Sequence, residues 1–587
     1  MQEKVCYNRS ITHFLQRKAG TPMLHTGCEF DRPYASEIFG ETRRVFYIYP
    51  REALMEEPIF PYFVLDGGAH NFAKDILGTA NGDDIRELTM SGRLFDAFTF
   101  RGKFSLESSF AYTAGTGFTP KYEWQIWPQR LYMTLPLAQA FLKTGDRTYA
   151  DKWLELVRAW DAAHPYQPFA DDVDYLKTDM VWRDMQAAWR SLSLMHGMFM
   201  LQEAPFDRET WEYLYRFVEL HVRHLYEEAQ NRLRRGLEGN HVLQIGLALV
   251  MAGALFPEFQ SSADYLRAGC ETVEMNMNAI YPDGASNEDS PSYSHFIARL
   301  YLETLLLLKR NGLPLISGLE ECVKNQYAWL WQMCTPDGHA PAISDSYTLD
   351  AEADLRRAAA LIDFPRPART SQMGPESRTA VLRKGCLTLY ADAMEYLDGH
   401  QHAGRPQILL YADKLPVIVD SGCCSYDIWD FYRYLRSAQA HNLLFSPDCP
   451  VEGGSIRQEM TDFDPVQGTL TLRSQVAHGD RSYTWTRRLR LTETRLTIED
   501  SAESDRPLTW QLHTHLCRRD LKELPEENAL LQLSEDLLIR IAADRPFALD
   551  FVPVMNERNE KDFARRIRFQ DSGKNFALTT TIDVTRR

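Results

Sequence analysis

The sequence predicts a multidomain α+β protein in which a helical domain precedes an all-β domain. The chain has 587 residues, more than one hydrophobic core usually organises, so two or more domains are expected. Its middle part repeats apolar residues at helical spacing, whereas its last part alternates apolar and polar residues with a period of two. A stretch rich in Pro, Ser and Arg at residues 363–378 separates the two patterns, and we place the linker at residues 366–378.

The predicted domain boundaries follow these changes in pattern. Residues 1–120 mix short strand-like pieces with Gly, Asp and Asn turns, and we expect a mixed extension that packs on the helical domain. Residues 121–365 hold serial amphipathic helices such as "RLYMTLPLAQAFLKTGD", in which Gly145 closes the helix as a C-cap would. Residues 379–587 contain strands such as "YTWTRRLRLTETRLTIED" between turn signals, which predicts a large antiparallel sheet assembly.

Composition and charge exclude several classes of protein. The formal net charge of -16 argues against a general nucleic-acid binder, although an anionic substrate is compatible with positive side chains gathered in one cleft. The 10 cysteines form no CxxC pattern and fit a reducing compartment. The first residues lack the apolar segment of a signal peptide, so we expect a cytoplasmic protein, or a periplasmic or secreted one if a leader was removed. The longest apolar run, residues 242–256, is too short to span a bilayer, and no membrane partner is expected.

Two segments of the helical domain could carry chemistry. In "RLRRGLEGNH", Asn240 and His241 stand at the start of a buried helix, where an amide and an imidazole offer hydrogen-bond donors to an anion. The alternative is that Asn240 is only an N-cap. The loop "YPDGASNEDSPSYSHF" contains Tyr293, which is either a packing residue or, beside a positive charge, a proton-transfer group.

Two segments of the β domain hold candidate metal ligands. In "DGHQHAG", His400 and His402 emerge on one face of a strand, where they could share a metal or divide metal binding from proton transfer; the alternative is a pair of surface histidines. The segment "VDSGCCSYDIWDFYRYLRSAQAHNLL" adds Asp420 and His441. Together His402, Asp420 and His441 form a ligand set acceptable to zinc or a similar divalent ion.

Taken in this order, the four segments resemble the heparinase II/III-like polysaccharide lyases. The lead-in "EWQIWPQRLYMTLPLAQAFLKTGDRTYADKW" and the segment "WRDMQAAWRSL" are also similar to that family, so the resemblance extends over residues 120–500. It implies an N-terminal incomplete (α/α) toroid followed by a C-terminal antiparallel β-sandwich. This fold agrees with the change of periodicity described above.

The resemblance implies cleavage of a uronic-acid-containing polysaccharide by β-elimination, which leaves a 4,5-unsaturated uronate end. Asn240 and His241 would bind the uronate carboxylate, and Tyr293 would act as base, acid or both. His400 would be the partner for proton abstraction, with Tyr426 or Tyr434 as alternatives. A glycosaminoglycan such as heparan sulfate, hyaluronan or chondroitin is the expected substrate, with alginate or oligoalginate as the alternative.

The resemblance also implies a structural divalent metal, zinc or else manganese or calcium, held by His402, Asp420 and His441. The metal would fix the loop that presents His400. Gly404 departs from the family, which often has an acidic residue at this position, so a supporting contact to the ligands is expected to be missing. The neighbouring Cys423 and Cys424 would be a soft ligand or buried thiols.

Substrate-binding residues are expected in the family-like stretches, where cations could pair with carboxylate or sulfate groups and aromatic rings could stack on sugars. For each of them, packing in the protein is the alternative. The expected partner is an anionic polysaccharide or oligosaccharide, and the oligomeric state, including a homo-oligomer, stays open. Rival functions are a glycoside hydrolase that pairs Asp283 or Glu288 with Asp345, and a non-catalytic carbohydrate-binding protein. The candidates are Trp127, Arg130, Arg183, Arg190, Glu288, Tyr426 and Arg436.

Overall fold

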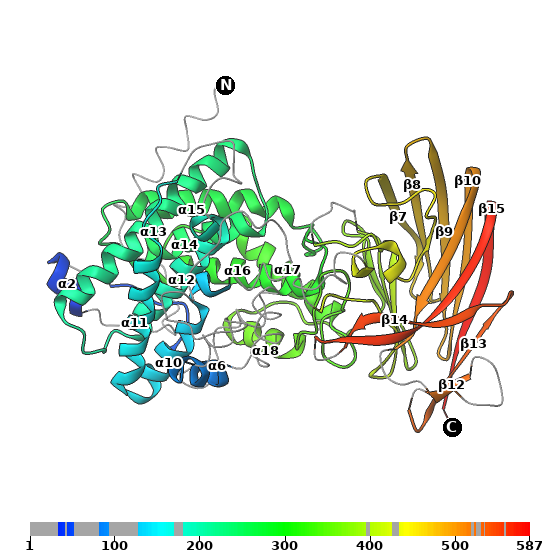
Figure 1. Ribbon diagram of the computed structural model, residues 1–587, viewed down its shortest axis with the longest axis horizontal. Coiled ribbons are helices and arrows are strands. Elements are labelled where there is room, and N and C mark those ends of the chain that lie inside the picture. Colours follow the sequence, from blue (N-terminus) through cyan, green and yellow to red (C-terminus); the bar gives the residue numbers. More distant parts are fainter. Residues whose placement is uncertain are drawn as a thin grey trace.

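The helices and the strands occupy separate lobes of the molecule, joined near the middle of the chain (Figure 1). The computed structural model describes residues 33–40, 44–51, 54, 82–92, 127–169, 180–394, 400–424, 434–517, 522–523, 530–532, 534–556 and 559–586. Most of the predicted extension at residues 1–120 lies outside these ranges. Among the described helices, none is both long enough and apolar enough to cross a membrane.

The helical lobe is built from amphipathic helices around the apolar helix α14, whose side chains are buried on nearly all sides. The Asp146 and Asp207 carboxylates accept backbone N–H groups at the starts of α11 and α13, and Gly145 ends α10 in the left-handed conformation, as predicted. The helices are α2 (Pro33–Phe39), α6 (Gly82–Met90), α10 (Leu135–Thr144), α11 (Arg147–Ala163), α12 (Asp184–Met200), α13 (Arg208–Arg235), α14 (Asn240–Leu255), α15 (Ser262–Asn276), α16 (Pro291–Arg310), α17 (Leu319–Met333) and α18 (Ala351–Leu361).

Close packing against α15 fixes the position of α14. A Cβ atom added at Gly269 of α15 would lie 2.6 Å from the Val250 backbone nitrogen of α14, so no larger residue fits there without movement. This contact matters for function because α14 begins at Asn240, one of the candidate site residues.

The β lobe is a sandwich of two antiparallel sheets. One sheet has the order β1-β2-β3-β4-β5, and the other has the order β11-β12-β13-β15-β10-β9-β8-β7, with β14 paired to β15 and β6 to β10. The strands are β1 (Gln372–Gly374), β2 (Thr379–Lys384), β3 (Leu387–Asp392), β4 (Gln407–Ala412), β5 (Leu415–Ile418), β6 (Leu444–Phe445), β7 (Ser455–Asp464), β8 (Thr469–His478), β9 (Arg481–Leu491), β10 (Arg495–His515), β11 (Lys522–Glu523), β12 (Leu530–Gln532), β13 (Leu537–Ala543), β14 (Ala548–Met555) and β15 (Lys561–Arg586).

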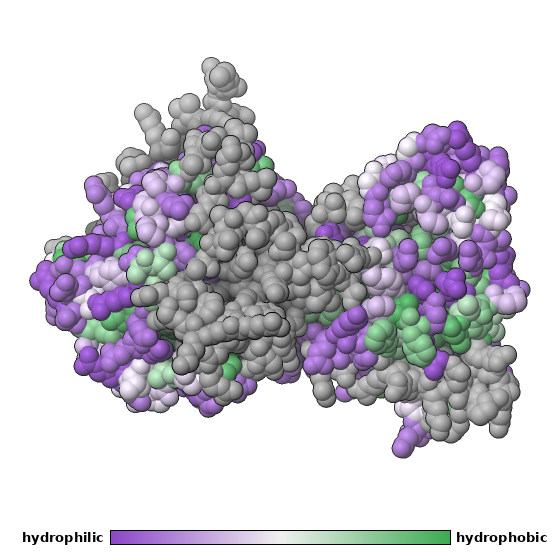
Figure 2. Space-filling view, in the orientation of Figure 1, coloured by the Kyte–Doolittle hydropathy of each residue, from purple (hydrophilic) through white to green (hydrophobic). Residues whose placement is uncertain are grey.

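The five-stranded sheet lies between the helices and the larger sheet, so both of its faces are buried. Leu382 and Leu389 belong to the core shared with the ten-stranded sheet, whereas Val381 and Tyr390 belong to the core of the helical lobe. Adjacent residues of β2 and of β3 therefore face different cores, as a period of two requires. Figure 2 shows hydrophilic residues over much of the described surface of the outer helices and the larger sheet.

Strand β1 falls within the predicted linker at residues 366–378. Its three residues pair with β2, with Gln372 opposite Val381, and the sequence gives no sign of this because three residues are too few to show an alternating pattern. The Asp283 carboxylate accepts the backbone N–H and the hydroxyl of Ser377, which ties the segment after β1 to the helical lobe.

Buried histidines make the stability of the fold sensitive to acid. Burial lowers the pKa of His224 and of His513 to about 4, and that of His196 to about 3. Between the unfolded pKa of about 6.5 and these values, the unfolded chain binds protons that the folded chain does not, so stability falls as the pH decreases.

We expect His224→Phe to weaken this acid sensitivity. The ring lies in an aromatic cluster with Tyr166 and Trp182, and its shift should account for about 2 kcal/mol of the stability lost between pH 7 and pH 5. Urea or thermal unfolding at pH 7 and pH 5 measures how much unfolding free energy is lost between them. A destabilisation caused by poorer packing of the phenyl ring is the same at both pH values and cancels in this difference. Tyr166→Phe is the control, because it alters the cluster without exchanging a proton in this range. An unchanged loss in His224→Phe would contradict the assignment.

Candidate active site

The candidate residues meet where the helical lobe faces the sandwich. Asn240 begins α14, Tyr293 lies in the first turn of α16, and the loop between them supplies Glu288. The loop between α17 and α18 adds Asp345. From the β lobe, His400 and His402 precede β4, Asp420 follows β5, and His441 follows the short 3-10 helix η8 (Ala438–Ala440).

The Asn240 amide is held in a defined orientation. Its Oδ1 accepts from Gln244 Nε2 at 3.3 Å, while its Nδ2 donates to Glu288 Oε1 at 2.8 Å and lies 3.4 Å from His400 Nε2. The helix cap is Gly239, whose φ of 136° favours glycine, so the alternative of Asn240 as an N-cap is wrong. The amide instead turns its donors toward the β lobe.

His400 lies against the phenol of Tyr293. The two rings are stacked, with centroids 3.8 Å apart and an interplanar angle of 23°. Burial alone would lower the pKa of His400, but the hydrogen bond to Asp345 and the negative charge of Glu288, whose Oε2 is 3.8 Å from Nε2, together raise it above its ordinary value. An amide and a phenol ring of the helical lobe thus both contact one imidazole of the β lobe.

The sequence suggested Asp345 only as one member of a glycoside hydrolase pair, whereas the structure places it against both candidate histidines. Its Oδ2 is 2.9 Å from His400 Nδ1, and its Oδ1 is 2.6 Å from His402 Nε2. Burial alone would raise the pKa of this carboxyl, but the hydrogen bonds from both histidines hold it well below its ordinary value. Asp345 is therefore placed as an acceptor for two histidines, an arrangement that does not favour the proton-donor role in a glycoside hydrolase.

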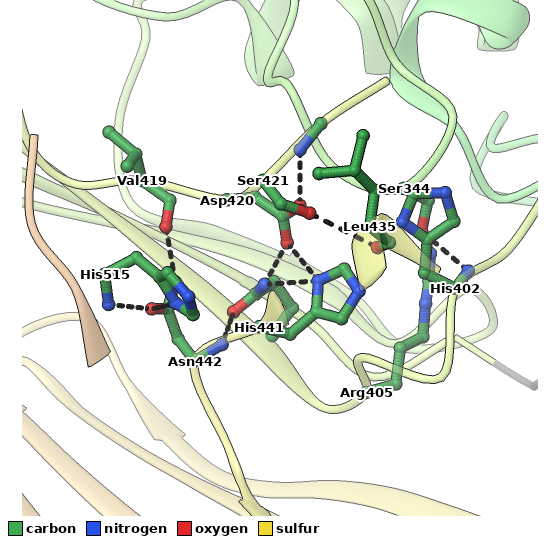
Figure 3. Close-up of polar contacts among 12 residues, drawn as sticks. Ser344, His402, Arg405, Val419, Asp420, Ser421, Leu435, His441, Asn442 and His515 are labelled. Carbon is green, nitrogen blue, oxygen red and sulfur yellow. Dashed lines mark hydrogen bonds and ion pairs between the residues drawn. The ribbon is translucent and has the colours of Figure 1, made fainter. Parts of the chain in front are cut away.

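His402, Asp420 and His441 form a buried group whose ligand atoms lie within 4.8 Å of one another. Figure 3 shows the Asp420 carboxylate facing the His441 ring, and the Nδ1 to Oδ2 distance is 2.9 Å. Burial alone would raise the pKa of Asp420, but the charge of His441 lowers it far below its ordinary value. The Nε2 atom of His441 is buried without a hydrogen-bond partner. Two imidazoles, one of them with an unsatisfied buried nitrogen, and one carboxylate fit a divalent metal such as zinc.

Gly404 is explained by its contact with His441. A Cβ atom at this position would lie 2.2 Å from His441 Cγ, so an acidic side chain cannot be accommodated here. The expectation that His402 lacks a supporting contact is wrong, because the Asp345 carboxylate contacts His402 from the helical lobe. Cys423 and Cys424 are buried thiols, and the metal-ligand group found among the described residues does not include them.

His241 and Arg436 lie at the border of the site. The His241 side chain is 47% exposed, and its Nδ1 is 3.4 Å from Asp184 Oδ2. Arg436 is half-buried and donates to the Gln401 carbonyl between the two histidines. Its positive charge acts to lower the pKa of His400, as expected of a cation beside the site.

The other predicted substrate-binding residues are placed differently. Arg130 and Arg190 are buried in the helical lobe, which disagrees with direct substrate binding: Arg130 donates to Gln186, and Arg190 lies 3.8 Å from the centre of the Trp160 ring. Arg183 is also buried, directly before α12. Tyr434 donates to the Gln439 carbonyl at 3.4 Å. The side chain of Trp127 and all of Tyr426 lie outside the described residues.

Two family models match the chain in succession. "Heparinase II/III N-terminus" matches residues 100–368, and "Heparinase II/III-like, C-terminal" matches residues 366–586. A curated relative, the heparin-sulfate lyase of Bacteroides stercoris, is 23% identical over 40% of this chain and 39% of its own length. The match therefore spans less than half of that relative.

Solved structures share the fold at low sequence identity. A crystal structure of heparinase III has a TM-score of 0.66 at 15% identity, covering 86% of this chain and 92% of its own. The heparan sulfate lyase of Pedobacter heparinus has a TM-score of 0.56 at 15% identity, covering 92% and 93%. The chondroitin AC lyase of Streptomyces coelicolor A3, with chondroitin sulphate, has a TM-score of 0.54 at 11% identity, covering 89% and 82%. These similarities confirm the predicted toroid followed by a β-sandwich.

Proposed function

Because this chain belongs to the heparinase II/III-like family, we propose that it is a polysaccharide lyase that cleaves a glycosaminoglycan at a uronic acid by β-elimination. One observation carries the proposal: the Asn240 amide and the Tyr293 ring both contact His400, at 3.4 Å and at a centroid distance of 3.8 Å. A proposed carboxylate-binding donor and two proposed proton-transfer groups thus meet where the toroid faces the sandwich.

The first task in this reaction is to stabilise charge at the uronate carboxylate. When C5 loses its proton, negative charge spreads onto the adjacent carboxylate, and hydrogen-bond donors fixed beforehand lower the energy of that state. The Asn240 Nδ2 group already donates to the carboxylate of Glu288, which supports a preference for this type of group. His241, next along α14, would add a second donor.

The second task is to move two protons. A base removes the C5 proton, the electrons of that bond form the C4–C5 double bond, the C4–O bond breaks, and an acid protonates the leaving O4. Tyr293 is the proposed acid and serves as base when both events occur on one face of the sugar. His400 is the proposed base when the C5 proton lies on the opposite face. Arg436, beside the histidines, is the proposed contact for substrate anions.

The test is a panel of hyaluronan, chondroitin, dermatan, heparan sulfate, heparin and alginate. We expect at least one glycosaminoglycan to yield a product that absorbs in the ultraviolet, because elimination creates a conjugated double bond. Cleavage of alginate alone would contradict the proposed glycosaminoglycan substrate and indicate an alginate lyase. If metal-replete protein gave no ultraviolet-absorbing product with any polysaccharide of the panel, the proposed lyase activity would be contradicted.

We also propose that His402, Asp420 and His441 hold a Zn²⁺ ion. When bound, the ion would crosslink the loops that present His400, and so keep the base in place. Metal analysis of the purified protein is expected to give about one zinc per chain, and His441→Ala is expected to lose it because one of three ligands is removed.

The matched control for His441→Ala is His339→Ala. His339 pairs with Asp337 in the α17–α18 loop and is not part of the metal-ligand group. It should leave the zinc content unchanged. Equal zinc content in the parent and in His441→Ala would contradict the site.

A further inference from the structure

We propose that Asp345 is a positioning residue that sets the tautomers of both His400 and His402 with one carboxylate. The inference rests on the proposed function, because it assigns His400 to proton transfer and His402 to the metal. Asp345 belongs to the toroid, and it would orient two histidines of the sandwich for two different roles.

The geometry follows from what an ionised carboxylate can do. It has no hydrogen-bond donor, so each ring nitrogen that faces it must carry the proton. Asp345 faces Nδ1 of His400 at 2.9 Å and Nε2 of His402 at 2.6 Å. The two rings therefore present opposite nitrogens to the same acid.

For His402, the consequence concerns metal binding. With its proton on Nε2, the neutral ring offers the lone pair of Nδ1, and this nitrogen is the one left to face a metal shared with Asp420 and His441. Carboxylates that hold the distal nitrogen of a metal-binding histidine fix its tautomer and its orientation.

For His400, the consequence concerns proton transfer. With its proton on Nδ1, the neutral ring carries a lone pair on Nε2, which points to the Asn240 amide at 3.4 Å. The amide can donate to this lone pair, and its orientation is fixed by Gln244 and Glu288. The nitrogen that could accept a substrate proton is thus turned toward the place where the uronate carboxylate would bind.

Asp345 is itself held by both lobes. Its backbone N–H donates to the His400 carbonyl at 3.1 Å. The preceding Ser344, at a φ of 58°, accepts from Arg405 of the β lobe at 2.8 Å. The following Ser346 contacts Ser290, just before α16. The acid is 3% exposed, so it has little room to turn away from the two rings.

The test compares Asp345→Asn with the parent as full-length protein. The amide has nearly the same shape but only one acceptor, so at most one histidine keeps its tautomer. We expect Zn²⁺ affinity, measured by competition with a chelator, or kcat, or both, to fall about 10- to 100-fold. KM should stay within about twofold, because substrate contacts are unchanged. In Asp345→Ala, added formate should restore part of the loss.

The matched control is Asp337→Asn, which alters a partly exposed Asp–His pair in the same loop, in which the carboxylate lies 3.3 Å from His339. It should leave Zn²⁺ affinity and kcat unchanged. Parent-like affinity and kcat in Asp345→Asn would overturn the inference, and so would equal losses in Asp337→Asn. If the parent cleaves no glycosaminoglycan, the proposed function fails, whereas the Zn²⁺ measurement still decides whether Asp345 orients His402.

Discussion

Tyr293→Phe is expected to lower kcat by about 10²- to 10⁴-fold while the affinity for substrate stays close to that of the parent. The substitution removes only the hydroxyl, which is the proposed proton donor to the leaving O4. The phenyl ring keeps its place, because Tyr293 is 6% exposed and stacks on His400 through its face. Initial rates of ultraviolet-absorbing product measure kcat, and calorimetric titration with substrate measures binding.

The control for this substitution is Tyr301→Phe. Tyr301 is a second buried tyrosine of α16, and burial raises its pKa well above the ordinary value, so its hydroxyl is neutral and is assigned no part in the reaction. It should keep parent activity. Full activity in Tyr293→Phe would remove the phenol from the mechanism and favour the non-catalytic interpretation of the site.

Asn240→Ala should have the second largest effect, a fall of about 10²- to 10³-fold in kcat. It deletes the donor that would meet the uronate carboxylate and the 2.8 Å side-chain bond to Glu288, whereas the Asn240 backbone N–H still donates to Glu288 at 3.2 Å. Because the stabilised charge develops in the transition state, kcat should fall more than KM rises. Steady-state rates on the preferred glycosaminoglycan separate the two parameters.

Asn325→Ala is the control for Asn240→Ala, since Asn325 is an asparagine on α17 whose amide donates to the Pro282 carbonyl in an exposed contact. A rise in KM without a fall in kcat in Asn240→Ala would contradict charge stabilisation and assign the amide to ground-state binding alone.

The two-domain architecture could be predicted from the sequence because it depends on local periodicity. The helical spacing and the Gly145 cap lie within single helices, and the alternation in β9 and β10 lies within adjacent strands. Strand β1 was assigned to the linker because three residues carry no period. Asn240, Tyr293 and His400 could be predicted because the motifs that contain them resemble, in the same order, those of the heparinase II/III-like family. In the structure, Asn240 and Tyr293 both contact His400.

The remaining features depend on contacts between distant segments. His400 and His402 were predicted to lie on a strand, but they lie in the loop before β4. Asp345 meets them from 55 and 57 residues away, and no spacing rule connects a loop of one domain to a loop of another. Arg190 was a candidate for substrate binding because it lies in a family-like stretch, with packing in the protein as the alternative. The structure supports packing, because the guanidinium stacks on Trp160 and donates to His221 in the interior of the toroid. The reason for Gly404 likewise appears only when the His441 ring is seen against its backbone.

In the proposed reaction, this site breaks the C4–O bond without adding water. Digestion of the preferred glycosaminoglycan in water enriched in oxygen-18, followed by mass spectrometry of the products, tests it directly. Elimination predicts that the new chain ends carry no label and that the fragment with the unsaturated sugar is lighter by one water than a hydrolysis product. One oxygen-18 at each cleaved bond, with no unsaturated end, would contradict the claim.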